Sequence, residues 1–137
     1  MALEATLVFE TGLPIPMQCA NGTGIEKGAI LKLSDPFTVA TADGDTDAVG
    51  GIAAEEKIAN DGKTTIAVYR EGIFKGFAGA AGVIVGMGII TDVSTGAANE
   101  LVVADVNSEH LVGIALETAT DTESFLFELK PLGLQLA

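Results

Sequence analysis

Gly-Ile-Ala-Ala-Glu at residues 51–55 recurs as Gly-Ile-Ala-Leu-Glu at residues 113–117. Two further pairs of glycine-rich or apolar stretches have similar spacing, since 24–31 matches 82–90 and 66–70 matches 125–129. The matched stretches begin 62, 58 and 59 positions apart (51 to 113, 24 to 82, and 66 to 125). A unit of about sixty residues that occurs twice predicts two similar β-motifs that close one barrel or sandwich, because neither half could bury its apolar face alone.

The repeated unit contains a hairpin signal. Two β-patterned runs, 52–59 and 63–70, flank Asn60-Asp61-Gly62. An Asp-Gly step between such runs predicts a β-hairpin, because both residues accept a positive φ. Residues 53–57 are rich in helix formers, so a short helix there is the alternative. The predicted fold class is therefore all-β: a small β-barrel or sandwich from two similar β-motifs, with an extended N-terminal arm.

Residues 1–20 are predicted to form this arm. A single β-domain, 21–137, follows it, with pseudo-repeats at about 24–73 and 82–133. Two prolines exclude a helix in the arm and favour polyproline or edge-strand geometry. Such a pre-ordered apolar segment can lie over another subunit at little entropic cost, and the alternative is that it packs on its own barrel. The candidate contact residues are Leu13, Pro14, Ile15, Pro16 and Met17.

Composition narrows the classes of partner. The chain has 137 residues, of which 7 are basic and 19 acidic, and its net charge of −12 opposes binding to nucleic acid or to an anionic membrane. The longest apolar window, 77–90, is too short to span a bilayer and is interrupted by glycines. Glu4 and Glu10 stand where a signal peptide would carry basic and then apolar residues, so synthesis in the cytoplasm is expected.

Residues that could carry chemistry are few. His110 is the only histidine and is expected in an exposed turn, without the convergent partners that a catalytic triad needs. Cys19 is the only cysteine, so it is expected to be a small covered apolar side chain. Asp43, Asp45 and Asp47 alternate as calcium ligands can, but Ala54 occupies the position where an EF-hand has its closing glutamate. The sequence thus predicts no catalytic residue, no cofactor and no metal site, and leaves open whether the three aspartates bind a cation.

An alternative function follows from Glu55-Glu56-Lys57-Ile58, which faintly resembles the lysine turn of lipoyl and biotinyl carrier domains. Those domains are small acidic β-barrels with internal pseudo-symmetry. Their lysine lies at a hairpin tip, whereas Lys57 precedes the predicted tip by four residues. A small carrier or ligand-binding β-barrel is therefore the second hypothesis.

The leading hypothesis comes from four short stretches that are spread along the chain between residues 24 and 119. These are 24–33 (Gly-Ile-Glu-Lys-Gly-Ala-Ile-Leu-Lys-Leu), 51–56 (Gly-Ile-Ala-Ala-Glu-Glu), 66–73 (Ile-Ala-Val-Tyr-Arg-Glu-Gly-Ile) and 112–119 (Val-Gly-Ile-Ala-Leu-Glu-Thr-Ala). The combination resembles the tailed-phage capsid decoration, or head cement, proteins. The resemblance implies a virion protein on the capsid surface that clamps neighbouring major capsid proteins, commonly as a homotrimer. It also implies that the protein is not an enzyme.

Overall fold

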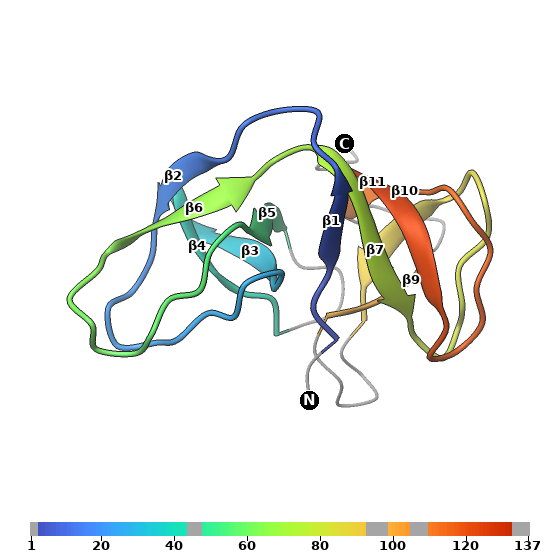
Figure 1. Ribbon diagram of the computed structural model, residues 1–137. Helices are drawn as coiled ribbons and strands as arrows, with labels where there is room; N and C mark the ends of the chain where they lie inside the picture. Colours follow the sequence, from blue (N-terminus) through green and yellow to red (C-terminus); the bar gives the residue numbers. More distant parts are fainter. Residues whose placement is uncertain (1–2, 44–47, 93–98, 105–109, 133–137) are drawn as a thin grey trace, which may run out of the picture.

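The computed structural model describes residues 3–43, 48–92, 99–104 and 110–132, and over these ranges the chain is all-β (Figure 1). The strands, in chain order, are β1 (Thr6–Phe9), β2 (Ile15–Gln18), β3 (Ile30–Asp35), β4 (Thr38–Thr41), β5 (Val49–Ala53), β6 (Thr65–Tyr69), β7 (Gly72–Ala78), β8 (Gly88–Thr91), β9 (Glu100–Val103), β10 (Leu111–Ala115) and β11 (Ser124–Leu132). The predicted all-β class, built from two similar β-motifs, is confirmed. In these ranges no helix is long and apolar enough to cross a membrane.

Each repeat closes its own five-stranded barrel. The first ring runs β2-β4-β3-β5-β6, and the second runs β7-β9-β8-β10-β11. In each ring, the strands that come first and third along the chain pair in parallel, as β2–β4 and β7–β9. The other pairs within the rings are antiparallel. Outside the rings, strand β1 pairs antiparallel with residues 73–75 of β7. The sequence had indicated one barrel shared by two motifs, and the structure instead shows two tandem barrels.

The two barrels match residue by residue. The pair Gln18–Thr65 in the first corresponds to Phe77–Ser124 in the second, so both strands are offset by the 59 residues seen between 66 and 125. The repeated glutamate has one role in both: Glu55 Oε2 accepts a hydrogen bond from the Ala67 amide at 2.8 Å, and Glu117 Oε1 accepts one from Leu126 at 2.9 Å. The repeated glutamate therefore holds the loop after β5 or β10 against β6 or β11.

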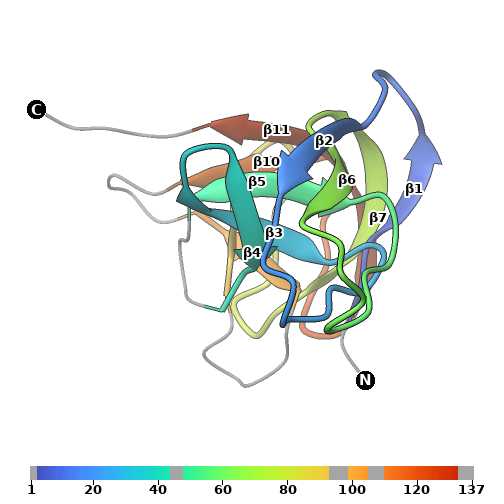
Figure 2. The ribbon, with the colours of Figure 1, turned by 90° about the vertical axis from the view of Figure 1, so that its left-hand side faces the viewer.

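The core of the first barrel contains aliphatic and sulfur-containing side chains and no aromatic ring among the described residues, because five short strands enclose little volume. Its core consists of Met17, Cys19, Ile25, Ala29, Leu31, Val39, Ala53, Ile66 and Val68. A second core fills the other barrel and continues across the junction, where Ile30 and Ile52 of the first barrel join Phe74 and Phe127 of the second. Asn99 spans the same junction: its Oδ1 accepts a hydrogen bond from the buried Ile30 amide at 2.8 Å. The barrels therefore share one buried interface. Figure 1 shows them side by side, and in Figure 2 the first barrel lies in front of the second.

The link between the barrels is short. Only Arg70 and Glu71 separate the end of β6 from the start of β7. Arg70 Nη1 donates hydrogen bonds to the carbonyl oxygens of Val49 at 3.2 Å and Gly50 at 2.9 Å. The connecting residue is thus tied to β5, and the chain crosses from one barrel to the other without a loose loop.

Three details differ from the sequence-based expectations. The predicted arm is not free, because Ile15–Gln18 is strand β2, paired with β6 and β4 inside the first barrel. The predicted hairpin exists as the β5–β6 pair, but β5 ends at Ala53 and β6 begins at Thr65, so a long loop replaces the tight Asp-Gly turn. That loop includes most of the alternative helix, 53–57, and contains no helix.

The loop between β5 and β6 and the equivalent loop between β10 and β11 each contain a turn that is capped by a carboxylate. Asp61 accepts hydrogen bonds from the Lys63 amide at 2.9 Å and the Ile58 amide at 3.3 Å. At the position of Asp61 in the second repeat, Glu123 accepts one from the Thr120 amide at 2.8 Å and one from its hydroxyl at 2.9 Å. The Lys63 amide lowers the pKa of Asp61, with Lys57 adding to it, and the Thr120 amide and hydroxyl lower the pKa of Glu123.

These caps predict acid-sensitive stability. A carboxyl whose folded-state pKa lies below its unfolded value stabilises the fold above the unfolded pKa, and this contribution is lost as the pH falls through the folded pKa. We expect the melting temperature to fall as the pH drops below the ordinary values of 3.8 for Asp61 and 4.5 for Glu123. Melting curves at stepwise lower pH check this, with the double variant Asp61→Asn/Glu123→Gln as comparison. Equal acid-induced losses in both proteins would contradict it.

Candidate functional site

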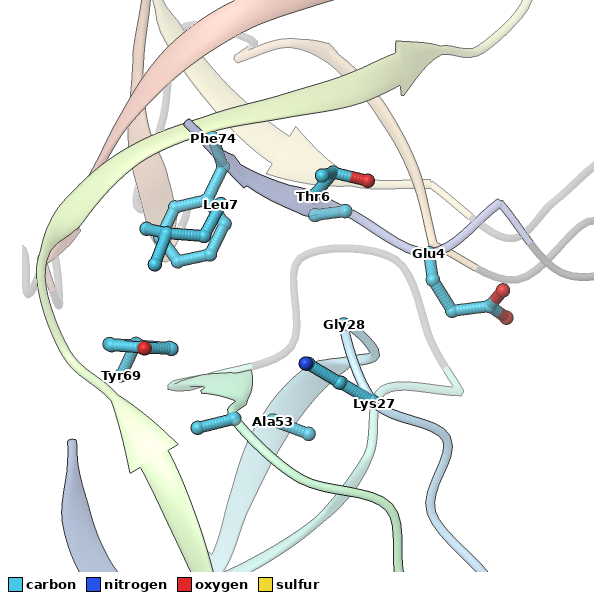
Figure 3. Close-up of a pocket in the computed structure, with 10 residues that line it drawn as sticks. Glu4, Thr6, Leu7, Lys27, Gly28, Ala53, Tyr69 and Phe74 are labelled. Carbon is cyan, nitrogen blue, oxygen red and sulfur yellow. The ribbon is translucent and has the colours of Figure 1, made fainter. Parts of the chain in front are cut away.

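A cleft lies between the two barrels, beneath the N-terminal strand (Figure 3). Its volume is about 550 Å³. The lining comes from five separate parts of the chain: Glu4, Ala5, Thr6, Leu7, Lys27, Gly28, Ala53, Ala54, Tyr69 and Phe74. The cleft exists because two rounded barrels meet at their cores and leave a gap at the rim, which the segment Glu4–Leu7 covers in part.

One wall of the cleft is aromatic and the other carries charge. The rings of Tyr69 and Phe74 meet edge to face, with centroids 5.7 Å apart. The Tyr69 hydroxyl donates a hydrogen bond to Glu10 Oε2 at 3.2 Å, and burial, followed by this carboxylate, raises the pKa of the phenol. The Lys27 ammonium points into the cleft, while the Glu4 carboxylate points away from the rings (Figure 3). The cleft can therefore hold an apolar side chain whose polar end meets Lys27.

The N-terminal segment is fixed at the cleft by one turn of the first barrel. The Ala5 amide donates a hydrogen bond to Gly28 O at 2.9 Å. Gly28 has a φ of 88°, and a Cβ there would overlap Ala5 O and meet Glu4 Cβ at 3.0 Å. Glycine is thus required twice at this position, by the backbone conformation and by the approach of the segment.

Where the structure describes them, the residues considered for chemistry do not converge. His110 is half-buried just before β10 rather than exposed, and residues 107–109 of the turn that was expected there lie outside the described residues. Cys19 is buried in the first core as predicted, and burial raises the pKa of its thiol. Asp43 pairs with Lys32 at 2.7 Å, while Asp45 and Asp47 lie outside the described residues. No cluster of three metal-ligating side chains occurs in the described ranges.

The predicted contact residues divide into two groups. Met17 is buried in the core of the first barrel, so its side chain cannot reach a partner. Leu13, 81% exposed, and Ile15, 37% exposed, lie on the surface beside Pro14 and Pro16. Phe9, at the end of β1, adds another exposed apolar side chain before them in the chain. The segment from Phe9 to Pro16 thus presents apolar surface to the outside, even though part of it is a barrel strand.

Lys57 is enclosed, which removes the basis for the carrier hypothesis. Its ammonium group donates hydrogen bonds to Asn21 O at 2.7 Å and Ile58 O at 3.2 Å, and it pairs with Asp61 Oδ1 at 3.3 Å. Its side chain is 1% exposed. A carrier lysine must extend from a hairpin tip to reach a modifying enzyme, whereas this one closes the end of the first barrel.

Comparison with known proteins places the fold. No protein-family model and no curated protein matches the chain. Among solved structures, the N base of the head fibre gp8.5 of bacteriophage phi29 matches with a TM-score of 0.55 and 16% sequence identity. The match covers 90% of this chain and 98% of the other, so both barrels take part. The chain has the fold of a phage head-fibre base. The head cement proteins that the sequence resembles and this structural neighbour are thus both found on phage heads.

The head-fibre-base fold brings together residues that sequence reasoning did not select. Lys27, Ala53 and Tyr69 line one cleft although they are far apart in the chain. The repeat offers one signal for them, since Val85 occupies the position of Lys27 in the second unit. Comparing the two units position by position separates the residues that build the barrel from those that differ at its surface.

Proposed function

We propose that this protein is a structural virion component that binds the outside of an assembled phage head and stabilises it by clamping neighbouring major capsid proteins. The observation that carries the proposal is the fold shared with the phi29 head-fibre base over nearly the full length of both chains. The resemblance of the sequence to head cement proteins supports the same role. We further propose that the protein acts as a homotrimer, as that resemblance implies.

The surface from Phe9 to Pro16 is the proposed contact with the shell or with a neighbouring subunit. Leu13, Pro14, Ile15 and Pro16 remain candidates, whereas the buried Met17 supports the contact only by holding β2 in its barrel. The apolar side chains would leave water on docking, which stabilises an interface by about 25 cal/mol for each Å² buried. A net charge of −12 keeps the free protein from associating non-specifically before it meets the head.

Co-sedimentation with empty phage heads tests the proposal. We expect the protein to sediment with expanded heads, and the variant Leu13→Asp to bind at least about tenfold more weakly, since a charge would be buried in the contact. Thr23→Asp is the matched control, because Thr23 is an exposed threonine of the first barrel outside the proposed contact. Deleting residues 1–17 is unsuitable, because it removes most of a barrel strand. Failure of the wild-type protein to bind expanded and unexpanded heads alike would refute the function.

A further inference from the structure

The two barrels carry the same backbone turn, but among the residues that the structure describes only the first copy of this turn is covered. Gly28 and Gly86 occupy equivalent positions, with φ angles of 88° and 84°. Their amides make equivalent hydrogen bonds, Gly28 to Ala53 O at 2.9 Å and Gly86 to Ala115 O at 2.8 Å. Gly28 is buried, whereas Gly86 is exposed. The same docking geometry is therefore present twice.

What covers the first turn is an extended segment of the chain itself. Glu4–Leu7 runs across it, with the Ala5 amide bonded to Gly28 O at 2.9 Å and Ala5 itself buried. At the second turn, an added Cβ on Gly86 would meet no atom within 4 Å. Within the described ranges, no amide donates to Gly86 O. As far as the described residues show, the second turn thus keeps a free acceptor and the space for an extended segment.

The surface around Gly86 is more apolar than its covered counterpart. Ile84, Val85, Met87 and Leu116 are each between 39% and 57% exposed. Hydrogen bonds bring them together: the Met87 amide bonds to Ile84 O at 3.0 Å, and Met87 O accepts the Ala115 amide at 3.0 Å. Their counterparts in the first repeat are Glu26, Lys27, Ala29 and Ala54. Four large apolar side chains therefore face solvent at a site whose twin is occupied. We call these four residues and Gly86 the Gly86 face.

Charge indicates what could cover this face. The flanking stretches 82–92 and 111–124 contain four carboxylates, Asp92, Glu117, Asp121 and Glu123, and no lysine or arginine. With the net charge of −12, this disfavours a second copy of the same chain. A segment that carries a basic residue beside its apolar side chains fits better.

We propose that the Gly86 face binds an extended apolar segment of another protein, with a small residue opposite Gly86 and a lysine or arginine beside it. The segment repeats in trans what Glu4–Leu7 does in cis, including a backbone amide that donates to Gly86 O. The source to which we assign the segment, the phage shell protein, rests on the function proposed above. This contact lies on the second barrel and is separate from the surface Phe9–Pro16 on β1 and the first barrel.

A peptide tests the face without any phage head. The probe is the sequence of residues 3–9 with lysine in place of Glu4, titrated into the ¹⁵N-labelled protein and followed by NMR. We expect saturable shift changes at 84–87 and 115–118, and weaker binding of the peptide that keeps glutamate. Gly86→Asn is expected to weaken binding at least about tenfold, because its Cβ stands where the peptide backbone must approach and a hydrogen bond is lost.

Gly62→Asn is the matched control. Gly62 has a φ of 87° and also has no atom within 4 Å of an added Cβ, so both variants impose the same backbone demand, which asparagine meets well. We expect Gly62→Asn to bind the peptide as the wild type does. No saturable binding, or equal weakening by both variants, would overturn the proposed face.

Binding to heads tests the source of the segment. If the wild type binds expanded heads, Gly86→Asn is expected to bind at least about tenfold more weakly and Gly62→Asn equally well. Equal binding by all three would overturn the assignment to the shell protein. If the wild type binds no heads, the proposed function fails, and the peptide titration still decides whether the face binds an extended segment.

Discussion

Replacing Gly113 by alanine is expected to destabilise the protein by about 3 kcal/mol or more, because the second barrel has no space for a side chain there. A Cβ at this position would overlap Glu128 O of the paired strand and lie 2.9 Å from its carbonyl carbon. The obstacle is backbone, so no rotamer change relieves it, and β10 and β11 must separate. At the equivalent position of the first barrel, Gly51 meets Tyr69 O and has a φ of 140°, so Gly51→Ala should be at least as damaging.

Urea denaturation measures this loss. Gly62→Ala is the control, since its φ of 87° imposes strain on alanine while nothing lies within 4 Å of the added Cβ. We expect it to cost about 1 kcal/mol, the strain of the left-handed backbone alone. The excess cost of Gly113→Ala then reports the steric overlap, and equal midpoint shifts for both variants would contradict the explanation.

Phe74→Ala is expected to lower the free energy of unfolding by about 3 to 5 kcal/mol. Phe74 is fully buried where the two barrels meet, with its ring centroid 5.7 Å from Tyr69 and 6.1 Å from Phe127. Truncation leaves a cavity bounded by rigid strands, so collapse can fill little of it. Because Phe74 also lines the cleft beneath β1, hydrogen exchange of β1 should accelerate more than that of β3.

Phe37→Ala is the control for this second variant, because it removes the same ring from an exposed turn. We expect a change within about 0.5 kcal/mol. Phe74→Leu, which keeps much of the volume, should cost less than about 1.5 kcal/mol. A loss for Phe74→Ala no larger than that for Phe37→Ala would show that the barrels are not held together through this ring.

The repeat was predictable because its positions are fixed by strand pairing. The neighbouring strand can approach closely only because position 51 and its equivalent 113 are glycine. The carboxylates of Glu55 and Glu117 accept a hydrogen bond from an amide of the following strand. Both requirements recur in each repeat, so both are visible in the sequence. The closure of each ring was not predictable from the same signal. Strand β2 pairs with β4 and β6, which follow at a distance in the chain, and its two prolines indicate an arm equally well.

The hairpin and the cleft show two other limits. The Asp61-Gly62 step predicted a tight turn, but the bridge between Ile25 and Lys57 holds the preceding residues in a separate pairing. The cleft depends on how two barrels meet, and its residues form no local pattern. Asn99 is an example, since its bond to the Ile30 amide joins positions 69 residues apart.

The joint between the barrels has a mechanical consequence. Arg70 and Glu71 alone connect β6 to β7, Arg70 is bonded to Val49 and Gly50, and Asn99 bonds across the shared core. A hinge needs residues whose dihedral angles can change freely, and these are restrained. The molecule should therefore move as one rigid body: a force that rotates one barrel rotates the other by the same angle, because the connection between them does not bend.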